Sequence, residues 1–500
     1  MTDSKVHLLL RARYGVSMSR AFLLVPLALL CLFAGCATRP VNPPITSITP
    51  GEGYQYRTRT GVMKDPANLV ILAFSGGGTR AAAFSYGVLE MLRRTEAIGP
   101  KGNRFRLIDA VDIITGVSGG SFTALAYGLY GERLFDTYEK RFLKRNVQGE
   151  LIARYVNPMN WAALSSPGWG RSELAAKLYD ESLFDGATFA DLQRKPGPLI
   201  AVMATDLSTG SRVLFNQSFF NVICSDLGPF LLSRAAAASS AVPVVLSPIT
   251  INNYGGTCHY AMPAWARLFT DPATAPRPAA RTVRRLEELE SYDDSAHRPY
   301  LHLVDGGVSD NLGLRGVLDF IEGIEASHML GQPTPLDSVR RMVIVVVNSM
   351  SSPRTNWDET EDAPGSLEIM LKASGVPIDR YSFESVELLR DITSRWQTLR
   401  RIRDSPAFTK GKDESLKEVI NAPDISLYAI DVSFGELADK KERDYLNNLP
   451  TSFALPDEAV DRLRASGGAI LLASPEFQRL LKDVGAKIVT DAKGANVSSP

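Results

Sequence analysis

Histidine and cysteine are scarce in this chain of 500 residues, which has five of the first and four of the second. They do not fall at the spacing of metal ligands, so the sequence gives no indication of a metal site. Charge of one sign is also lacking, because 55 basic residues balance 55 acidic ones. A neutral chain has no basic footprint for nucleic acid, and nucleic-acid binding is not expected. The remaining composition, 45% hydrophobic and 22% charged, is typical of a globular protein with a large core.

The N-terminal apolar run is short. AFLLVPLALLCLFAG, residues 21–35, has fewer than the roughly 20 residues that a comfortable membrane span needs. It follows three arginines and ends in small residues, which predicts a secretory signal peptide over residues 1–35. The stretch FAGC (33–36) resembles a bacterial lipobox, with Phe33 in place of the usual aliphatic residue, so we expect cleavage before Cys36 and lipidation of that cysteine. The alternative is an N-terminal anchor helix. Both place the body of the protein outside the cytoplasm, in the bacterial outer membrane or periplasm.

Export with removal of the signal peptide would change the net charge of the protein and the number of its cysteines. Removing residues 1–35 deletes four basic side chains and one acidic one and leaves a net charge of −3. Such a body is not drawn to anionic lipid, so attachment to the membrane is expected to come from the lipid on Cys36. Cys31 leaves with the signal, and Cys224 and Cys258 remain as a pair in an oxidising compartment. They are predicted to form a disulfide; two buried free thiols are the alternative.

The body of the chain alternates short apolar runs with helical patterns. Residues 37–67 are rich in proline, threonine and glycine and are predicted to form a tether. The alternation from residue 68 onward indicates an α/β layered domain over 68–350. The expected strands are 68–75, 112–118, 198–207, 211–216, 300–307 and 341–349, and the expected helices are 80–93, 119–130 and 231–241. The continuous apolar run at 341–349 is typical of a strand that is covered on both faces.

Two stretches interrupt this alternation. Residues 264–299 are rich in proline, arginine and glutamate and are predicted to form a surface insertion. Residues 366–403 predict one or two long helices, whose apolar side chains pack on the domain or, less favoured, touch a membrane. Residues 455–484 predict two more helices, so that 351–500 form a helical C-terminal extension packed on the domain.

A glycine-rich turn follows the first expected strand. Residues 76–81, GGGTRA, match the relaxed pattern G-x-G-x-x-A between a strand and a helix. Glu96 lies where a dinucleotide site has the acid that binds ribose. A dinucleotide- or phosphate-binding protein is therefore one interpretation of this turn.

A second turn carries a candidate nucleophile. ITGVSGGS (114–121) holds G-x-S-x-G with Ser118 at its centre, between an expected strand and an expected helix. In this context a serine sits on a tight turn with its oxygen accessible. The serine needs a base. His328 would give the order Ser118, Asp305, His328 of a triad esterase, but Asp305 is the better candidate because it ends an expected strand and is followed by Gly306 and Gly307.

Three motifs together resemble the patatin-like phospholipase family: GGGTR (76–80), GVSGG (116–120) and DGG (305–307). Residues 238–249 and 308–316 are also similar to that family, and the resemblance covers roughly residues 68–350. It implies a layered α/β/α domain with a mainly parallel central sheet. In this chain Ser75 replaces the aspartate often found before the glycines, and Ala81 replaces a frequent glycine.

The resemblance also implies a chemistry. Ser118 would be the nucleophile and Asp305 the base of a Ser–Asp dyad, and the amides of Gly76, Gly77, Gly78 and Gly119 would stabilise the oxyanion. Supporting roles would go to Arg80, Gly116, Gly120, Gly306 and Gly307. The expected activity is hydrolysis of lipid acyl esters without a metal or other cofactor, with a lipid or phospholipid as substrate. An acyl acceptor other than water would make the same site an acyltransferase. Residues 264–299 and 366–403 are expected to shape the substrate entrance.

Overall fold

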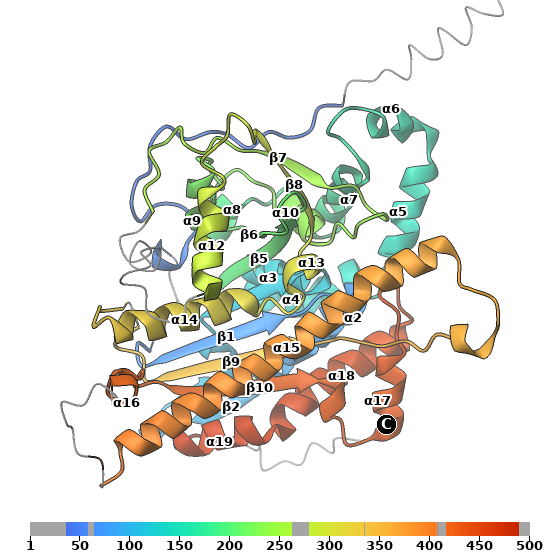
Figure 1. Ribbon diagram of the computed structural model, residues 1–500. Coiled ribbons are helices and arrows are strands. Elements are labelled where there is room, and N and C mark those ends of the chain that lie inside the picture. The colour runs from blue at the N-terminus through green and yellow to red at the C-terminus, as the bar shows by residue number, and fades with distance from the viewer. Residues whose placement is uncertain are drawn as a thin grey trace, which may run out of the picture.

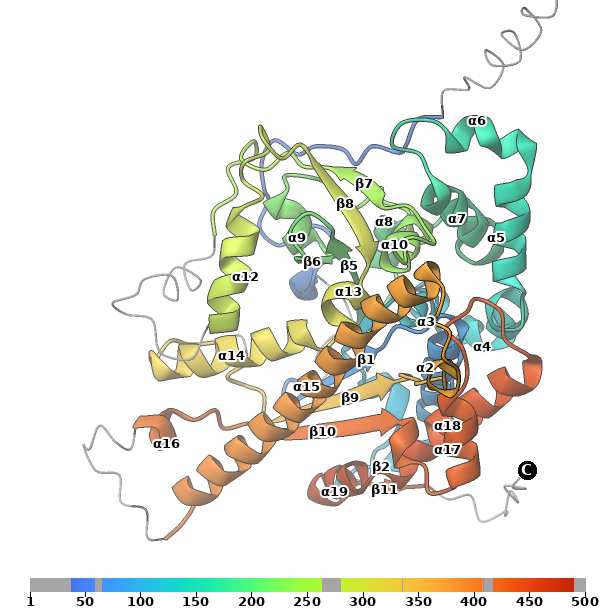
Figure 2. The same ribbon diagram turned by 45° about the vertical axis from the view of Figure 1, so that its right-hand side comes forward.

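The computed structural model describes residues 37–58, 65–262, 280–334, 336–406, 408 and 417–489. At its centre lies an eight-stranded sheet with helices on both faces, as the sequence predicts (Figures 1 and 2). The strands follow the order β10-β9-β1-β4-β5-β8-β7, with β6 paired to β5 outside this path. Their bounds are β1 Asn68–Phe74, β4 Ile113–Val117, β5 Leu199–Asp206, β6 Arg212–Leu214, β7 Ile249–Asn252, β8 Tyr300–Asp305, β9 Arg341–Asn348 and β10 Ser426–Ser433.

The helices make up most of the rest of the described chain. The longer ones are α2 Gly78–Arg94, α3 Gly119–Tyr130, α5 Val147–Val156, α7 Arg171–Tyr179, α10 Leu232–Ser239, α12 Ala280–Glu290, α14 Arg315–Met329, α15 Ser366–Arg403, α17 Lys440–Asn447, α18 Asp457–Ala473 and α19 Pro475–Asp483. The shorter ones are α4 Leu134–Tyr138, α6 Trp161–Leu164, α8 Phe189–Gln193, α9 Gln217–Val222, α13 Gly307–Asp310 and α16 Lys417–Asn421. Among the described helices, none combines the length and the apolar character needed to cross a bilayer.

The register of the sheet brings the three motif turns together. β1, β4 and β5 are parallel, with Phe74 opposite Gly116 and Val117 opposite Met203. β8 runs antiparallel to β5 and places Asp305 opposite Ala204. Because these positions lie at one level, the turns after β1, β4 and β8 meet at one edge of the sheet.

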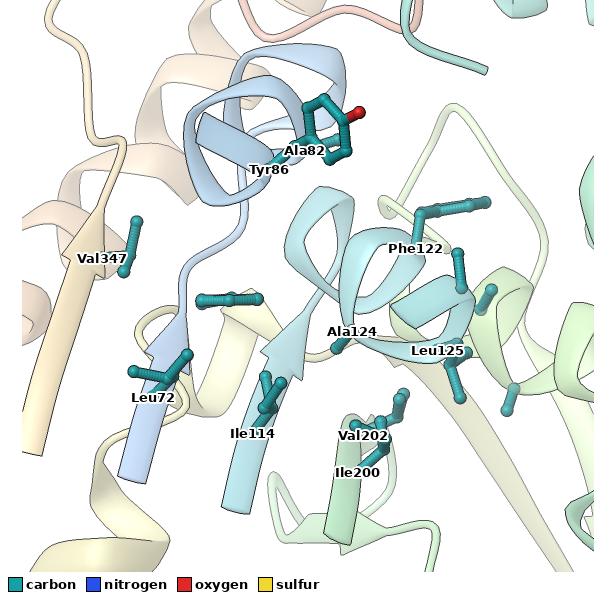
Figure 3. Packing of buried hydrophobic residues seen from close by; sticks show 14 of the residues in the cluster. Leu72, Ala82, Tyr86, Ile114, Phe122, Ala124, Leu125, Ile200, Val202 and Val347 are labelled. Atoms are coloured by element: carbon teal, nitrogen blue, oxygen red, sulfur yellow. The ribbon is translucent and has the colours of Figure 1, made fainter. Parts of the chain in front are cut away.

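Alternating side chains of the central strands supply two cores. On β9, Val343, Val345 and Val347 join the larger core with α2, α3 and α18 (Figure 3). The intervening Met342, Ile344 and Val346 join the second core, under α14 and α15. Burial on both faces explains why this strand is apolar throughout.

The C-terminal region is helical in α15, α18 and α19, as predicted, but it also contributes a strand. β10 pairs in parallel with β9 along its whole length and extends the sheet beyond residue 350. α18 crosses α2 closely: a Cβ on Gly87 would lie 2.0 Å from the carbonyl oxygen of Arg464. The central sheet therefore depends on residues from the C-terminal region.

One prediction about a connecting segment is wrong for the described residues. The tether is packed from residue 37 to 58: Asn42 and Tyr54 are buried, and the amide of Ile45 donates to the carbonyl of Cys224 at 2.9 Å. Residues 59–64 of the tether, and residues 264–279 of the insertion, lie outside the described part. The rest of the insertion contains α12 and buries Leu286 and Tyr292. Its few apolar residues share one helix face. This helical pattern is hard to recognise in the sequence because charged residues separate them.

Candidate active site

Ser118 occupies a strained turn between β4 and α3. Its φ of 47° and ψ of −120° are unusual for a residue with a side chain. The turn is tight because Gly120 packs on β1, where a Cβ would lie 2.6 Å from the carbonyl oxygen of Ser75. The amide of Ser118 donates to Oγ of Ser239 at 2.9 Å, which fixes the turn from α10. Ser118 is only 5% exposed.

Asp305 lies at the end of β8 beside this serine. Its carboxylate accepts a hydrogen bond from the amide of Gly307 at 2.7 Å, and it lies near enough to the Ser118 side chain for the two to interact. Its own amide donates to the carbonyl of Ala241 at 3.0 Å. Burial raises the pKa of Asp305 to about 6, although the hydrogen bond from Gly307 and the interaction with Ser118 oppose the shift. The structure thus brings together the two residues that the sequence predicts as a dyad.

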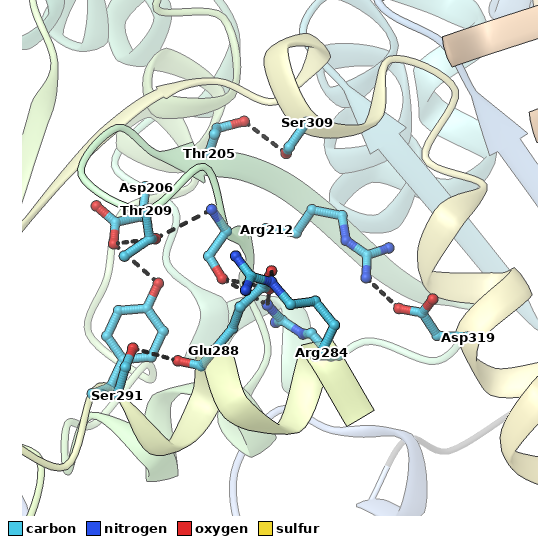
Figure 4. A network of polar contacts seen from close by, with 12 residues as sticks. Thr205, Asp206, Thr209, Arg212, Arg284, Glu288, Ser291, Ser309 and Asp319 are labelled. Atoms are coloured by element: carbon cyan, nitrogen blue, oxygen red, sulfur yellow. Dashed lines mark hydrogen bonds and ion pairs between the residues drawn. The ribbon is translucent and has the colours of Figure 1, made fainter. Parts of the chain in front are cut away.

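Polar contacts hold the loop behind Asp305. Thr205 Oγ1 donates to the Asp305 carbonyl at 2.9 Å and pairs with Ser309 Oγ at 2.8 Å (Figure 4). Asp310 accepts hydrogen bonds from the amides of Leu314 at 3.1 Å and Arg315 at 2.9 Å. These bonds connect β5, α13 and the start of α14, so the position of Asp305 is fixed by its surroundings.

The glycine turn contributes amides next to Ser118. Gly77 and Gly78 have positive φ values of 139° and 61°, which favour glycine. A Cβ on Gly119 would lie 2.0 Å from the carbonyl oxygen of Gly78, so the two turns are in direct contact. In the described part of the chain no hydrogen-bond acceptor is found for the amides of Gly77, Gly78 or Gly119.

Gly76 differs from its neighbours. Its amide donates to the carbonyl of Asn311 at 2.8 Å, so it is already paired. The prediction that Gly76 supplies an oxyanion donor is therefore wrong. Its role is steric: a Cβ at this position would lie 2.5 Å from Oδ1 of Asn311 and 3.3 Å from Cβ of Ser118.

Arg80 connects the glycine turn to distant parts of the chain. It is buried, and it donates to the carbonyls of Ser349 at 2.7 Å and Leu449 at 2.8 Å and to Oγ1 of Thr451 at 3.1 Å. Burial lowers its pKa to about 10. The carbonyl of Ser452 also accepts the amide of Thr79 at 2.8 Å. Arg80 therefore fixes the turn to residues 449–452 and to the end of β9.

Sequence reasoning did not find several residues that support the site. Ser239, Asn311 and residues 449–452 act through backbone groups or short polar side chains, which leave no distinctive pattern. Ser239 and Asn311 do lie in the two further stretches that resemble the family, residues 238–249 and 308–316. Their roles follow from contacts across more than 100 residues of sequence.

The structure disagrees with both alternative sites. In the triad alternative His328 would serve Ser118, but its Nε2 lies 3.4 Å from Oδ1 of Asp337, at the end of α14. None of the four histidines in the described ranges hydrogen-bonds to Ser118 or Asp305. In the dinucleotide alternative Glu96 would follow a strand beside β1. Instead it begins the short strand β2 Glu96–Ile98, in a separate sheet with β3 Arg104–Arg106 and β11 Lys487–Ile488.

The predicted disulfide is confirmed. Cys224 and Cys258 are bonded, with their Cα atoms 5.4 Å apart and a sequence separation of 34. Cys36 and the predicted signal peptide lie outside the described residues.

Comparisons with known proteins bear on the same region. Human GIVD cytosolic phospholipase A2 aligns with 85% of this chain at 12% identity, with a TM-score of 0.40. The alignment covers 63% of the human chain, so this chain spans less than two thirds of that length. VipD from Legionella pneumophila aligns with 91% of this chain and 72% of its own, at 10% identity and a TM-score of 0.30. Scores this low transfer no structural detail to this chain.

A comparison with curated proteins finds no significant match. The family comparison is more specific, because it matches residues 72–318 to the patatin-like phospholipases. These residues contain the glycine turn, Ser118 and Asp305. Residues 72–318 of this chain are thus similar to the patatin-like phospholipases, and the layered α/β/α arrangement spans the same residues.

Proposed function

We propose that this protein hydrolyses lipid acyl esters with Ser118 as nucleophile and Asp305 as general base. The observation that carries the proposal is the placement of Ser118 beside the buried carboxylate of Asp305. The amides of Ser118 and of Gly306, the residue after Asp305, both donate to Ser239. The serine also sits on a strained turn beside amides without acceptors. A hydroxyl needs such a base to become nucleophilic at neutral pH, and a carboxylate with a pKa near 6 is largely ionised there.

The mechanism follows from these positions. Asp305 accepts the hydroxyl proton while Ser118 Oγ bonds to the ester carbonyl carbon. The amides of Gly77, Gly78 and Gly119 donate to the oxyanion of the tetrahedral intermediate. The alcohol leaves with the proton from Asp305 and an acyl ester remains on Ser118. Asp305 then takes a proton from water, which attacks this ester, and the fatty acid leaves as Ser118 regains its proton.

We also propose that the protein is an exported lipoprotein, anchored in the bacterial envelope by a lipid on Cys36. The signal-like segment and the lipobox-like FAGC support this, and so does the disulfide, which is typical of oxidising compartments. Mass spectrometry of the mature N-terminus tests the proposal. An unmodified Cys36, or a retained residue 1–35 segment, contradicts it.

Active-site labelling tests the chemistry. A fluorophosphonate lipid probe should form an adduct on Ser118, located by peptide mass spectrometry. Ser118→Ala should abolish labelling and hydrolysis, and Asp305→Asn should slow both strongly. Ser85→Ala is a matched control, because Ser85 is a buried serine on α2 with no side-chain hydrogen bond. His328→Ala should retain activity. An adduct elsewhere, or full activity in Ser118→Ala, contradicts the proposal.

A further inference from the structure

The corner formed by α5 and α6 exposes large apolar side chains to an unusual degree. Ile152 is 54% exposed, Val156 65%, Met159 85% and Trp161 51%. The indole N–H of Trp161 donates to the carbonyl of Tyr155 at 3.2 Å, so its polar atom is satisfied inside the protein. What this corner presents outward is therefore mainly apolar surface, of the kind that marks an interaction site.

The described chain begins at the same corner. The amide of Ala37 donates to Oγ of Ser166 at 3.2 Å, and Ser166 Oγ donates to the carbonyl of Ala162 on α6 at 3.1 Å. Arg39 strengthens this attachment by donating to the carbonyl of Thr250 at 3.2 Å. In Figures 1 and 2 the first described residues lie beside α6.

A second exposed apolar pair connects this corner with the active site. Val244 and Val245 are 44% and 50% exposed, and Val244 has a φ of 74°, which is strained for a β-branched residue. Arg171, at the start of α7, donates to the carbonyl of Val244 at 2.9 Å. The same loop follows Ala241, whose carbonyl accepts the Asp305 amide. Val244 and Val245 thus add exposed apolar side chains on the loop that holds Asp305.

We propose that this surface, made of the α5–α6 corner and Val244–Val245, lies on a lipid bilayer. The proposal rests on the lipid anchor at Cys36 proposed above. Because Ala37, the residue after the proposed lipidation site, is held at α6, the anchor favours contact of this corner with the membrane, and the site would then face its substrate. Tryptophan is favoured at such a boundary because its ring is amphipathic. With a net charge of −3 in the mature chain, contact through apolar side chains is favoured over electrostatic attraction.

Quenching of tryptophan fluorescence tests this orientation. The mature, lipidated full chain is bound to phosphatidylcholine–phosphatidylglycerol vesicles that contain phosphatidylcholine brominated near the headgroup. Strong quenching is expected, and Trp161→Phe should remove most of it, at low and at high salt. Met159→Glu should lower the quenching by roughly half or more, because it places a charge at the lipid boundary. Ile420→Glu is the matched control, on α16 at the opposite corner of the fold.

The result is separable from catalysis. The rate of hydrolysis of a soluble short-chain ester should be the same in all three variants as in the wild type. If the wild type does not hydrolyse this ester, the proposed function is contradicted and the orientation is not. Three results would overturn the orientation: Trp161 unquenched in protein that floats with the vesicles, equal effects of Met159→Glu and Ile420→Glu, or corner variants that change only self-association.

Discussion

Asp305 links catalysis and stability through one buried charge, and Asp305→Asn separates the two. Burial raises the pKa of this carboxyl from an ordinary value of 3.8 to about 6. The folded state therefore favours the protonated acid. The resulting stabilisation is present below about pH 4 and is lost as the pH rises through about 6. At neutral pH the ionised Asp305 therefore lowers the free energy of unfolding by about 3 kcal/mol, since a tenfold change in proton affinity corresponds to about 1.4 kcal/mol.

Asparagine has a similar shape and removes this cost. The free energy of unfolding of Asp305→Asn should equal that of the wild type near pH 4 and exceed it by about 3 kcal/mol at neutral pH. Chemical denaturation across this range measures the difference. The same variant should lose roughly 10²–10⁴-fold in kcat because it has no base. For the wild type, kcat/KM should fall about tenfold per pH unit below about pH 6 and be flat above it.

Asp431 provides a matched control. Burial raises its pKa to about 6 as well, but it lies on β10 and pairs with Arg390 at 3.1 Å. Asp431→Asn should therefore leave kcat and its pH profile unchanged. If Asp305→Asn keeps wild-type activity, or the profile stays flat down to about pH 4.5, Asp305 is not the base. If Asp305→Asn is less stable than the wild type at neutral pH, the assigned burial cost is wrong.

Three further outcomes test how the site is held. Arg80→Lys keeps the charge, but a lysine cannot donate to all three acceptors of Arg80. The value of kcat should therefore fall by about 10-fold or more with KM little changed. A change in KM alone would refute this positioning role. Gly119→Ala should displace the glycine turn and slow fluorophosphonate labelling by at least about 10-fold, whereas Gly323→Ala, where a Cβ meets open space, should label normally. Reducing the Cys224–Cys258 disulfide should lower the free energy of unfolding by about 3–4 kcal/mol, measured by denaturation with and without reductant; an unchanged midpoint would contradict it.

Contacts between distant segments explain where the predictions were wrong. Residues 37–58 have the composition of a spacer, yet Asn42 and Tyr54 are buried because the domain offers them polar and apolar partners. The C-terminal region contains predicted helices, but β10 is apolar enough to complete the edge of the sheet. Local composition does not record such partners, since they lie far away in sequence.

The sequence by itself determined the α/β class and most of the strands and helices up to residue 350, and it predicted Ser118 and Asp305 as the candidate catalytic pair. These rest on local signals: apolar periodicity, turns that only glycine fits, and residue types with a defined chemistry. Tertiary structure alone decided that the amide of Gly76 is occupied by Asn311, and that Arg80 reaches residues 449–451. It also decided that Ala37, the first described residue, lies at an exposed apolar corner. Hydrogen bonds and burial depend on which segments the sheet brings together, and no local pattern contains that information.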